Sequence, residues 1–254
     1  MQIGSYVIRK KYKGDILFKI DKIIDGTAIV KGVYIRIIAT ALLEDLIEIS
    51  QIELNYYNKL FSDKEKDLES FYQYNKNHKT GKILHIDSDM SYLMKCNKIY
   101  EDLGLYAVCI LLESRYIVKY LLELVSEYHP DIVVLTGHDS YNQKDIKNLD
   151  NYQNTKDYIN ATKLLRKYYS LNDLYIFAGA CGSNFEALIA SGANSASSPK
   201  RVNIDAYDPA ICAVKAATTP FDQIISFKSI WEHSLTKEDG IGGVESFGYM
   251  RMIM

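Results

Sequence analysis

A thiol and an imidazole follow two consecutive apolar segments of the chain, each beside glycine. The segment 131–135 runs into His138, and the segment 174–178 runs into Cys181, which has a glycine close on either side. A thiol attacks carbonyl carbons as the thiolate, and an adjacent imidazole lowers the pKa of a thiol. A lone cysteine or histidine after a buried strand is more often structural, so the pairing carries the argument. The pair predicts acyl transfer by a Cys–His dyad, and no third catalytic residue is evident.

Backbone groups beside both residues are suited to binding an oxyanion. Ser183 and Glu186 have the spacing of a capping box, so we expect a helix to begin just past the cysteine. The positive end of that helix favours a thiolate. The backbone N–H groups expected to hold the oxyanion, or to line the cleft, belong to Gly137, Asp139 and Gly182.

From residue 82 onward, apolar strands alternate with amphipathic helices. The expected strands are 83–86, 105–112, 131–135 and 174–178. The expected helices end near residue 103 or span 115–128 and 155–169. This alternation is typical of a parallel sheet covered on both faces, whose sites form beyond the carboxyl ends of the strands. We therefore predict an α/β catalytic domain over residues 82–254.

The first fifty residues have a different rhythm, with short strands separated by turns. The expected strands are 5–9, 16–20, 27–31 and 33–38, with a further strand or short helix over 42–49. Asp25 and Gly26 form a strong hairpin signal. We predict a small β-rich domain over 1–52, an SH3-like barrel, and a charged helix and linker over 53–81. The polarity and lysine content of this linker also suggest self-cleavage there.

Composition excludes several classes of function. The net charge of −2 gives no electrostatic footprint for nucleic acid, and no apolar run is long enough to span a membrane. The N-terminus lacks a secretory signal, so we expect synthesis in the cytosol and reduced thiols. The chain has four cysteines: Cys96, Cys109, Cys181 and Cys212. The spacing of these cysteines matches no zinc site, and we expect neither metal nor cofactor.

Further motifs occur in a fixed order along nearly the whole chain. They are residues 14–18, 84–87, 130–132, 136–139, 176–181, 192–194, 196–201 and 240–245. A histidine and then a cysteine at the ends of consecutive strands resembles the caspase-like superfamily, which includes clostripain, gingipain, legumain and separase. The ordered motifs are more specifically similar to the YabG family, the sporulation-specific proteases of endospore-forming Firmicutes. Three positions depart from these patterns: Asp139 where the superfamily usually has Gly, and Gly182 and Asp205 where the family commonly has Gln and His.

The resemblance implies a caspase-like, mostly parallel α/β/α sandwich and a cysteine endopeptidase active in sporulation. Its implied substrates are spore coat and cortex-related precursors, often cleaved after Arg or Lys, and its implied location is the developing spore coat. It implies no nucleic-acid or membrane partner.

A basic side chain in a cleft needs a carboxylate, because an unpaired buried charge is costly. An ordinary solvated or capping role is the more frequent one for any single carboxylate. Asp87 and Asp89 follow the first strand of the catalytic domain; they orient a substrate or His138, or cap the next helix, which is the more common role. The candidate substrate-binding carboxylates are Asp87, Asp139, Glu186, Asp205 and Asp208.

Two other functions fit parts of the sequence. Residues 179–183 match the Gly-x-Cys-x-Ser elbow of glutamine amidohydrolases, which take their histidine from later in the chain, where His233 is available. A non-catalytic spore coat morphogenetic scaffold that retains the fold is the second alternative. The oligomeric state stays open.

Overall fold

The computed structural model describes residues 1–59 and 78–253. The chain divides into two compact units, Met1–Leu68 and Glu69–Met254. Most of the predicted linker, 53–81, lies outside the described residues, and so does most of the proposed self-cleavage region. A helix begins at residue 51, just before this linker region, and is described as far as residue 59. The boundaries 1–52, 53–81 and 82–254 remain predictions.

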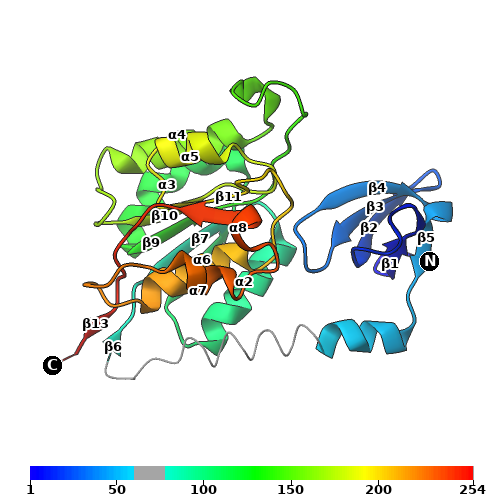
Figure 1. The fold of residues 1–254 in the computed structure, drawn as a ribbon, viewed down its shortest axis with the longest axis horizontal. Helices are drawn as coiled ribbons and strands as arrows, with labels where there is room; N and C mark the ends of the chain where they lie inside the picture. The colour runs from blue at the N-terminus through cyan, green and yellow to red at the C-terminus, as the bar shows by residue number, and fades with distance from the viewer. Residues whose placement is uncertain (60–77, 254) are drawn as a thin grey trace. The chain divides into compact units, whose positions relative to one another are not determined.

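The N-terminal unit is a five-stranded antiparallel sheet in the order β4-β3-β2-β1-β5 (Figure 1). Alternate side chains point into a small core of seven buried residues: Val7, Phe18, Ile20, Ala28, Val30, Ala41 and Leu46. The predicted hairpin is present, with positive φ at both Asp25 and Gly26. The strands are β1 Tyr6–Arg9, β2 Phe18–Ile24, β3 Thr27–Gly32, β4 Ile38–Leu42 and β5 Leu46–Glu48. The β-rich domain is confirmed, and its closure into a barrel remains a prediction.

The fourth strand of this unit begins later than predicted. The N–H of Gly32 donates to the carbonyl of Ile37 at 2.8 Å, which closes a turn where the sequence predicted strand. The segment after β4 contains both predicted alternatives, a short 3-10 helix η2, Leu43–Asp45, and then β5. A second 3-10 helix, η1 Lys10–Tyr12, follows β1.

The C-terminal unit is built on a six-stranded sheet in the order β12-β11-β10-β9-β7-β8. Neighbours from β8 to β11 are parallel, and β12 is antiparallel to β11. The mostly parallel sheet is therefore confirmed. Its strands are β7 Ile83–Asp87, β8 Ala107–Leu111, β9 Ile132–Leu135, β10 Tyr175–Ala178, β11 Ser195–Ser197 and β12 Ile241–Gly243. A separate two-stranded ladder joins β6 His78–Lys79 to β13 Arg251–Met252.

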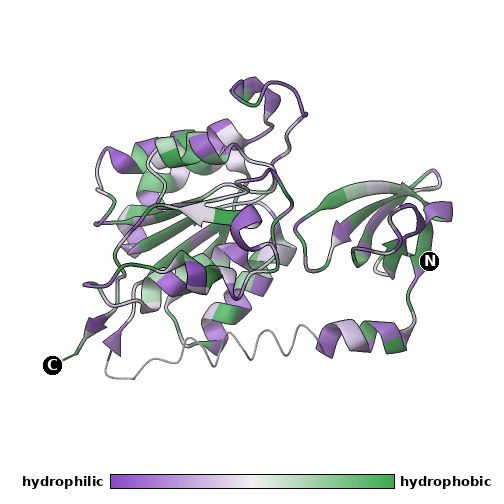
Figure 2. Cartoon of the chain, viewed as in Figure 1, coloured by the Kyte–Doolittle hydropathy of each residue, from purple (hydrophilic) through white to green (hydrophobic). Residues whose placement is uncertain are grey.

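Helices cover both faces of this sheet. Helices α3, α4 and α5 lie on one face, and α2, α6 and α7 lie on the other (Figure 1). Strands β7, β9 and β10 are hydrophobic along most of their length (Figure 2) and buried, as two covered faces require. The helices are α2 Met90–Asp102, α3 Ser114–Tyr128, α4 Thr155–Arg166, α5 Phe185–Ala190, α6 Asp208–Thr218, α7 Phe227–Trp231 and α8 Lys237–Gly240, with a 3-10 turn η3 Leu149–Asn151. None of the helices in the described ranges has both the length and the apolar run that crossing a membrane requires.

The order of the strands places a switch point between β7 and β9. The chain moves from β7 to β8 on one side and then returns to β9 on the other side of β7. Loops at the carboxyl ends of strands on either side of such a point diverge and leave a crevice, which is where parallel α/β sheets bind ligands. The loop after β7 carries Asp89, and the loop after β9 carries His138.

Candidate active site

The register of β9 and β10 aligns the two residues predicted to form the dyad. These strands are parallel neighbours, with Leu135 paired to Ala178. His138 lies three residues beyond Leu135, and Cys181 lies three residues beyond Ala178. Both side chains therefore belong to adjacent loops at one edge of the sheet.

The carboxylate of Asp139 ties these two loops together. One of its oxygens accepts a hydrogen bond from Ser183 Oγ at 2.7 Å and another from Thr155 Oγ1. The other oxygen accepts from the backbone N–H groups of Ser140 and Asn154, both at 2.8 Å. Burial raises the pKa of Asp139, although these hydrogen bonds oppose the shift. The side chain of Asp139 therefore holds the loops of the site to the start of α4.

His138 is held from two directions. Its Nε2 lies 2.9 Å from Oδ2 of Asp89, in the loop after β7. Its backbone carbonyl accepts hydrogen bonds from Asn154 Nδ2 at 2.8 Å and from the hydroxyl of Tyr158 at 3.2 Å. The ring of Tyr92 meets the imidazole edge to face, with 6.1 Å between centroids. The sequence left two roles open for Asp89, orienting a substrate or His138 and capping the next helix. Its side chain contacts His138 and also caps α2.

The glycine before the histidine is required by close packing. Gly137 has φ of +153°, and a Cβ there would lie 2.1 Å from Oγ of Ser88. Any larger residue would push the loop after β9 away from the loop after β7. The motif Gly-His is thus explained by the approach of the two loops.

Cys181 is 8% exposed, and its sulfur contacts a backbone N–H group that the sequence did not indicate. The N–H of Ile204 donates to its Sγ at 3.4 Å. The N–H of Gly182, predicted to hold the oxyanion, donates to Ser198 Oγ at 3.1 Å and to the carbonyl of Val202 at 3.3 Å. The loop after β11 therefore supplies the amide at the sulfur. No motif marks Ile204, because any residue can present a backbone N–H.

The helix after the cysteine begins one residue later than the capping box predicts. Asn184 is the N-cap of α5, and its side chain accepts from the N–H of Ala187 at 3.0 Å. The predicted cap, Ser183, instead accepts from the N–H of Ala180 at 3.0 Å and donates to Asp139. The predicted capping box is wrong, because the hydroxyl of Ser183 donates its hydrogen bond to Asp139 and does not cap the helix.

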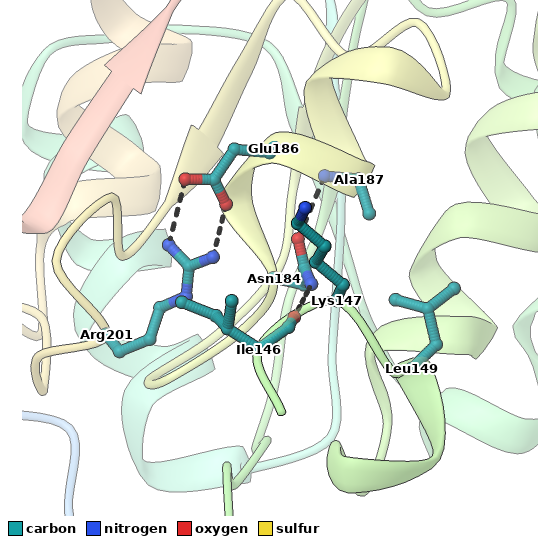
Figure 3. Close-up of a pocket in the computed structure, with 7 residues that line it drawn as sticks. All are labelled: Ile146, Lys147, Leu149, Asn184, Glu186, Ala187 and Arg201. Atoms are coloured by element: carbon teal, nitrogen blue, oxygen red, sulfur yellow. Dashed lines mark hydrogen bonds and ion pairs between the residues drawn. The ribbon is translucent and has the colours of Figure 1, made fainter. Parts of the chain in front are cut away.

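Glu186, the other half of that box, is paired with Arg201. Two guanidinium nitrogens of Arg201 bond its two carboxylate oxygens (Figure 3). The pair forms one wall of a pocket of about 510 Å³ beside the start of α5. The pocket is lined by Ile146, Lys147, Leu149, Asn184, Glu186, Ala187 and Arg201. Glu186 therefore lines the pocket with its charge already paired to Arg201.

Two further candidate carboxylates, Asp205 and Asp208, are fully buried near the loop after β11. The oxygens of Asp205 accept hydrogen bonds from the N–H groups of Tyr207 and Leu235, both at 3.0 Å. Oδ2 of Asp208 accepts from the N–H of Asp205 at 3.0 Å and from Thr236 Oγ1 at 2.8 Å. Asp205 directly follows Ile204, whose N–H contacts the sulfur of Cys181.

Asp87, the remaining candidate, is also fully buried and supports the loop after β7. Its Oδ1 accepts from the N–H of Asp89 at 2.9 Å, and its Oδ2 lies 3.9 Å from Nε2 of His85. Nδ1 of His85 is in turn 2.8 Å from the hydroxyl of Tyr100. The carboxylate of Asp87 thus faces inward, toward groups of its own fold.

Comparisons with known proteins point to one family. The chain matches the family described as YabG peptidase U57 over residues 2–254. It is 36% identical over 282 residues to the sporulation-specific protease YabG of Bacillus subtilis (strain 168), an alignment that covers 100% of this chain and 97% of that protein. No solved structure gives a match.

Proposed function

The chain belongs to the YabG peptidase U57 family, as its ordered motifs predicted, and from this premise we propose that it is a cysteine endopeptidase with Cys181 as nucleophile and His138 as acid–base residue. Membership makes it a sporulation-specific peptidase. The observation that carries the cysteine type is the register of β9 and β10, which sets His138 and Cys181 at matching positions beyond paired residues.

The reaction follows from the chemistry of this pair. The Cys181 thiolate attacks the scissile carbonyl carbon, and the carbonyl oxygen gains negative charge. The C–N bond then breaks as His138 gives its proton to the leaving amine, which leaves a thioester on Cys181. Water, deprotonated by His138, hydrolyses the thioester. The N–H of Ile204, already directed at the sulfur, is suited to stabilise the oxyanion beside it.

The proposed domain architecture is caspase-like. A histidine and a cysteine after consecutive parallel strands, with helices on both faces of the sheet, support this proposal. The N-terminal sheet is proposed to be an SH3-like barrel on the strength of its strand rhythm.

The proposed substrates are spore coat and cortex-related proteins, cleaved after Arg or Lys. A basic side chain entering a buried site needs a carboxylate partner. Among the candidates, Asp205 is the best supported, because the residue before it contacts the sulfur of Cys181. Glu186 is already paired with Arg201, and Asp139 is bonded to the loops around it. The mechanism uses no metal or cofactor.

Cleavage of a mixed peptide library, followed by mass spectrometry, tests the nucleophile, the histidine and the specificity together. We expect wild type to cleave after Arg or Lys, and Cys181→Ala and His138→Ala to lose cleavage. Cys109→Ala, a partly exposed thiol outside the loops of the site, serves as the matched control and should retain it. Cleavage by Cys181→Ala at the wild-type rate would overturn the proposal.

The same library separates the alternatives. Loss of activity in His233→Ala alone would favour the amidohydrolase arrangement. An arginine chloromethylketone should label Cys181 in the folded protein. Failure to label it would favour a non-catalytic coat scaffold.

A further inference from the structure

We propose that Asp89 is a positioning residue for His138, which makes the site a Cys–His–Asp arrangement. This inference rests on the proposed function for its catalytic meaning. It is carried by the 2.9 Å contact between Oδ2 of Asp89 and Nε2 of His138 across the switch point of the sheet. The carboxylate fixes which nitrogen of the imidazole faces the reaction.

The carboxylate of Asp89 is itself held in place. Its Oδ1 accepts from both the N–H and the Oγ of Ser91, at 2.9 and 2.6 Å, and so caps α2. Its backbone N–H donates to Oδ1 of Asp87 at 2.9 Å. Its side chain is 4% exposed, whereas that of His138 is 30% exposed. One oxygen is therefore engaged by the helix cap, and the other is directed at the imidazole.

Behind Asp89, a line of buried polar groups leads into the fold. Asp87, His85 and Tyr100 are each fully buried, and contacts of 3.9 and 2.8 Å connect them in that order. A carboxylate with buried, hydrogen-bonded neighbours keeps its orientation, and supporting groups of this kind govern the geometry of the residues that react.

The contact dictates the tautomer of the neutral imidazole. Asp89 accepts the proton on Nε2 of His138, so the lone pair is on Nδ1. When Nδ1 takes a proton, the imidazolium lies against a carboxylate that stabilises its charge. Nδ1 then passes that proton to the leaving amine, and Asp89 stays ionised throughout.

Capping of α2 is the competing role for Asp89, and the substitution Asp89→Asn separates the two. Asparagine caps helices about as well as aspartate, so the bond to Ser91 is retained. Its amide, however, can present a donor to Nε2, and the neutral ring then carries its proton on Nδ1. Replacement of the aspartate behind a catalytic histidine by asparagine lowered kcat about 10⁴-fold in a serine protease through this change of tautomer.

The test combines kinetics with nitrogen NMR of the ¹⁵N-histidine-labelled protein. Asp89→Asn should lower kcat at least about 100-fold and leave KM within about threefold, because the loss lies in the transition state. The His138 signals, assigned by their disappearance in His138→Gln, should show the proton on Nε2 in wild type and on Nδ1 in Asp89→Asn. Asp102→Asn, the same change at an exposed carboxylate at the end of α2, is the matched control and should stay within about threefold of wild-type kcat.

Two outcomes would overturn the inference: kcat of Asp89→Asn within about threefold of wild type, or an unchanged tautomer. If Asp89→Asn does not fold, Asp89→Ser takes its place, because serine also caps helices but is too short to reach His138. The tautomer is read without turnover, so it tests Asp89 even if Cys181→Ala shows that the proposed function is wrong.

Discussion

Asp139 illustrates how a residue beside a proposed catalytic residue can be needed for structure. It directly follows His138, and its carboxylate receives four hydrogen bonds from Ser140, Asn154, Thr155 and Ser183. Truncation would leave those donors without their acceptor, at a cost of about 1–3 kcal/mol for each buried one. The residue thus couples the stability of the fold to the geometry of the site.

Asp139→Ala should lower the free energy of unfolding by about 2–4 kcal/mol. Urea unfolding followed by the fluorescence of Trp231 measures this change, because the single tryptophan lies in the C-terminal unit. Asp222→Ala, an exposed carboxylate in the same unit, should stay within about 0.5 kcal/mol of wild type. Equal effects of the two substitutions would contradict the role given to Asp139.

The same residue predicts a pH dependence. Burial raises the pKa of Asp139 above its usual 3.8, so in the window between the two values the native state holds more protons than the unfolded state. The stability contributed by Asp139 is therefore greatest at the acid end of this window and declines as pH rises through it. Asp139→Asn, which does not titrate, should destabilise more at pH 4 than at pH 7. Urea unfolding of both proteins across this range measures the difference, and a constant difference would refute it.

Among the elements, α4 and the strands beside it meet at Arg166. This side chain ends α4 and donates to the carbonyls of Gly192, Ser170 and Leu174 at 2.7, 3.1 and 3.0 Å. It also donates to Oδ1 of Asn194 at 2.5 Å. Burial lowers the pKa of Arg166 to about 10. The guanidinium group of Arg166 thus links the end of α4, the start of β10 and the turn before β11.

Arg166→Lys should lower the free energy of unfolding by about 2 kcal/mol, because an ammonium group cannot reproduce the planar fork. The measurement is again urea unfolding of the C-terminal unit. Lys167 is the next residue and is exposed, so it serves as the control. The reverse substitution there, Lys167→Arg, should leave the free energy of unfolding almost unchanged. If Arg166→Lys is also neutral, the carbonyl contacts contribute little.

The strands and helices of the C-terminal unit were largely predictable, because their burial requires apolar residues. Strands β7, β9 and β10 have to be apolar on both faces, and that requirement is visible as continuous runs at 83–86, 131–135 and 174–178. The start of β4 was not predictable, because a backbone hydrogen bond from Gly32 closes the turn before it.

The candidate site could be proposed from sequence only where the chemistry demands a particular residue type. His138 and Cys181 are recognisable as candidates because a thiol and an imidazole after neighbouring strands form a rare combination. For Asp89 the sequence offered both His138 and the helix cap and could not choose, because the side chain contacts both. The partner of Ser183 was not predicted, because Asp139 is distant from it in sequence. Ile204 acts through its backbone and leaves no signal at all.

Within the described residues, each unit has a hydrophobic cluster of its own. One lies within the N-terminal sheet, and another lies between the central sheet and α3, α4 and α5. Val30 belongs to the first core and Val133 to the second, and both are fully buried. A cavity made in one core therefore removes contacts from that unit alone.

Val30→Ala and Val133→Ala should each destabilise their own unit by about 2 kcal/mol. Hydrogen exchange measured by mass spectrometry should become faster in β1 to β5 for the first variant and in β7, β9 and β10 for the second. Each variant is the control for the other. Faster exchange in both units from either substitution would show that the two unfold as one cooperative body.

The groups gathered at the sheet edge also have an order in time. A ribosome releases Asp89 first, His138 next, Cys181 later and the segment of Ile204 after that. The imidazole cannot be oriented beside a thiolate until β10 has added to β9, and the amide at the sulfur arrives only with the chain beyond β11. With the proposed Cys–His site, a nascent chain therefore carries the components of the peptidase without its activity until synthesis of the sheet is nearly complete.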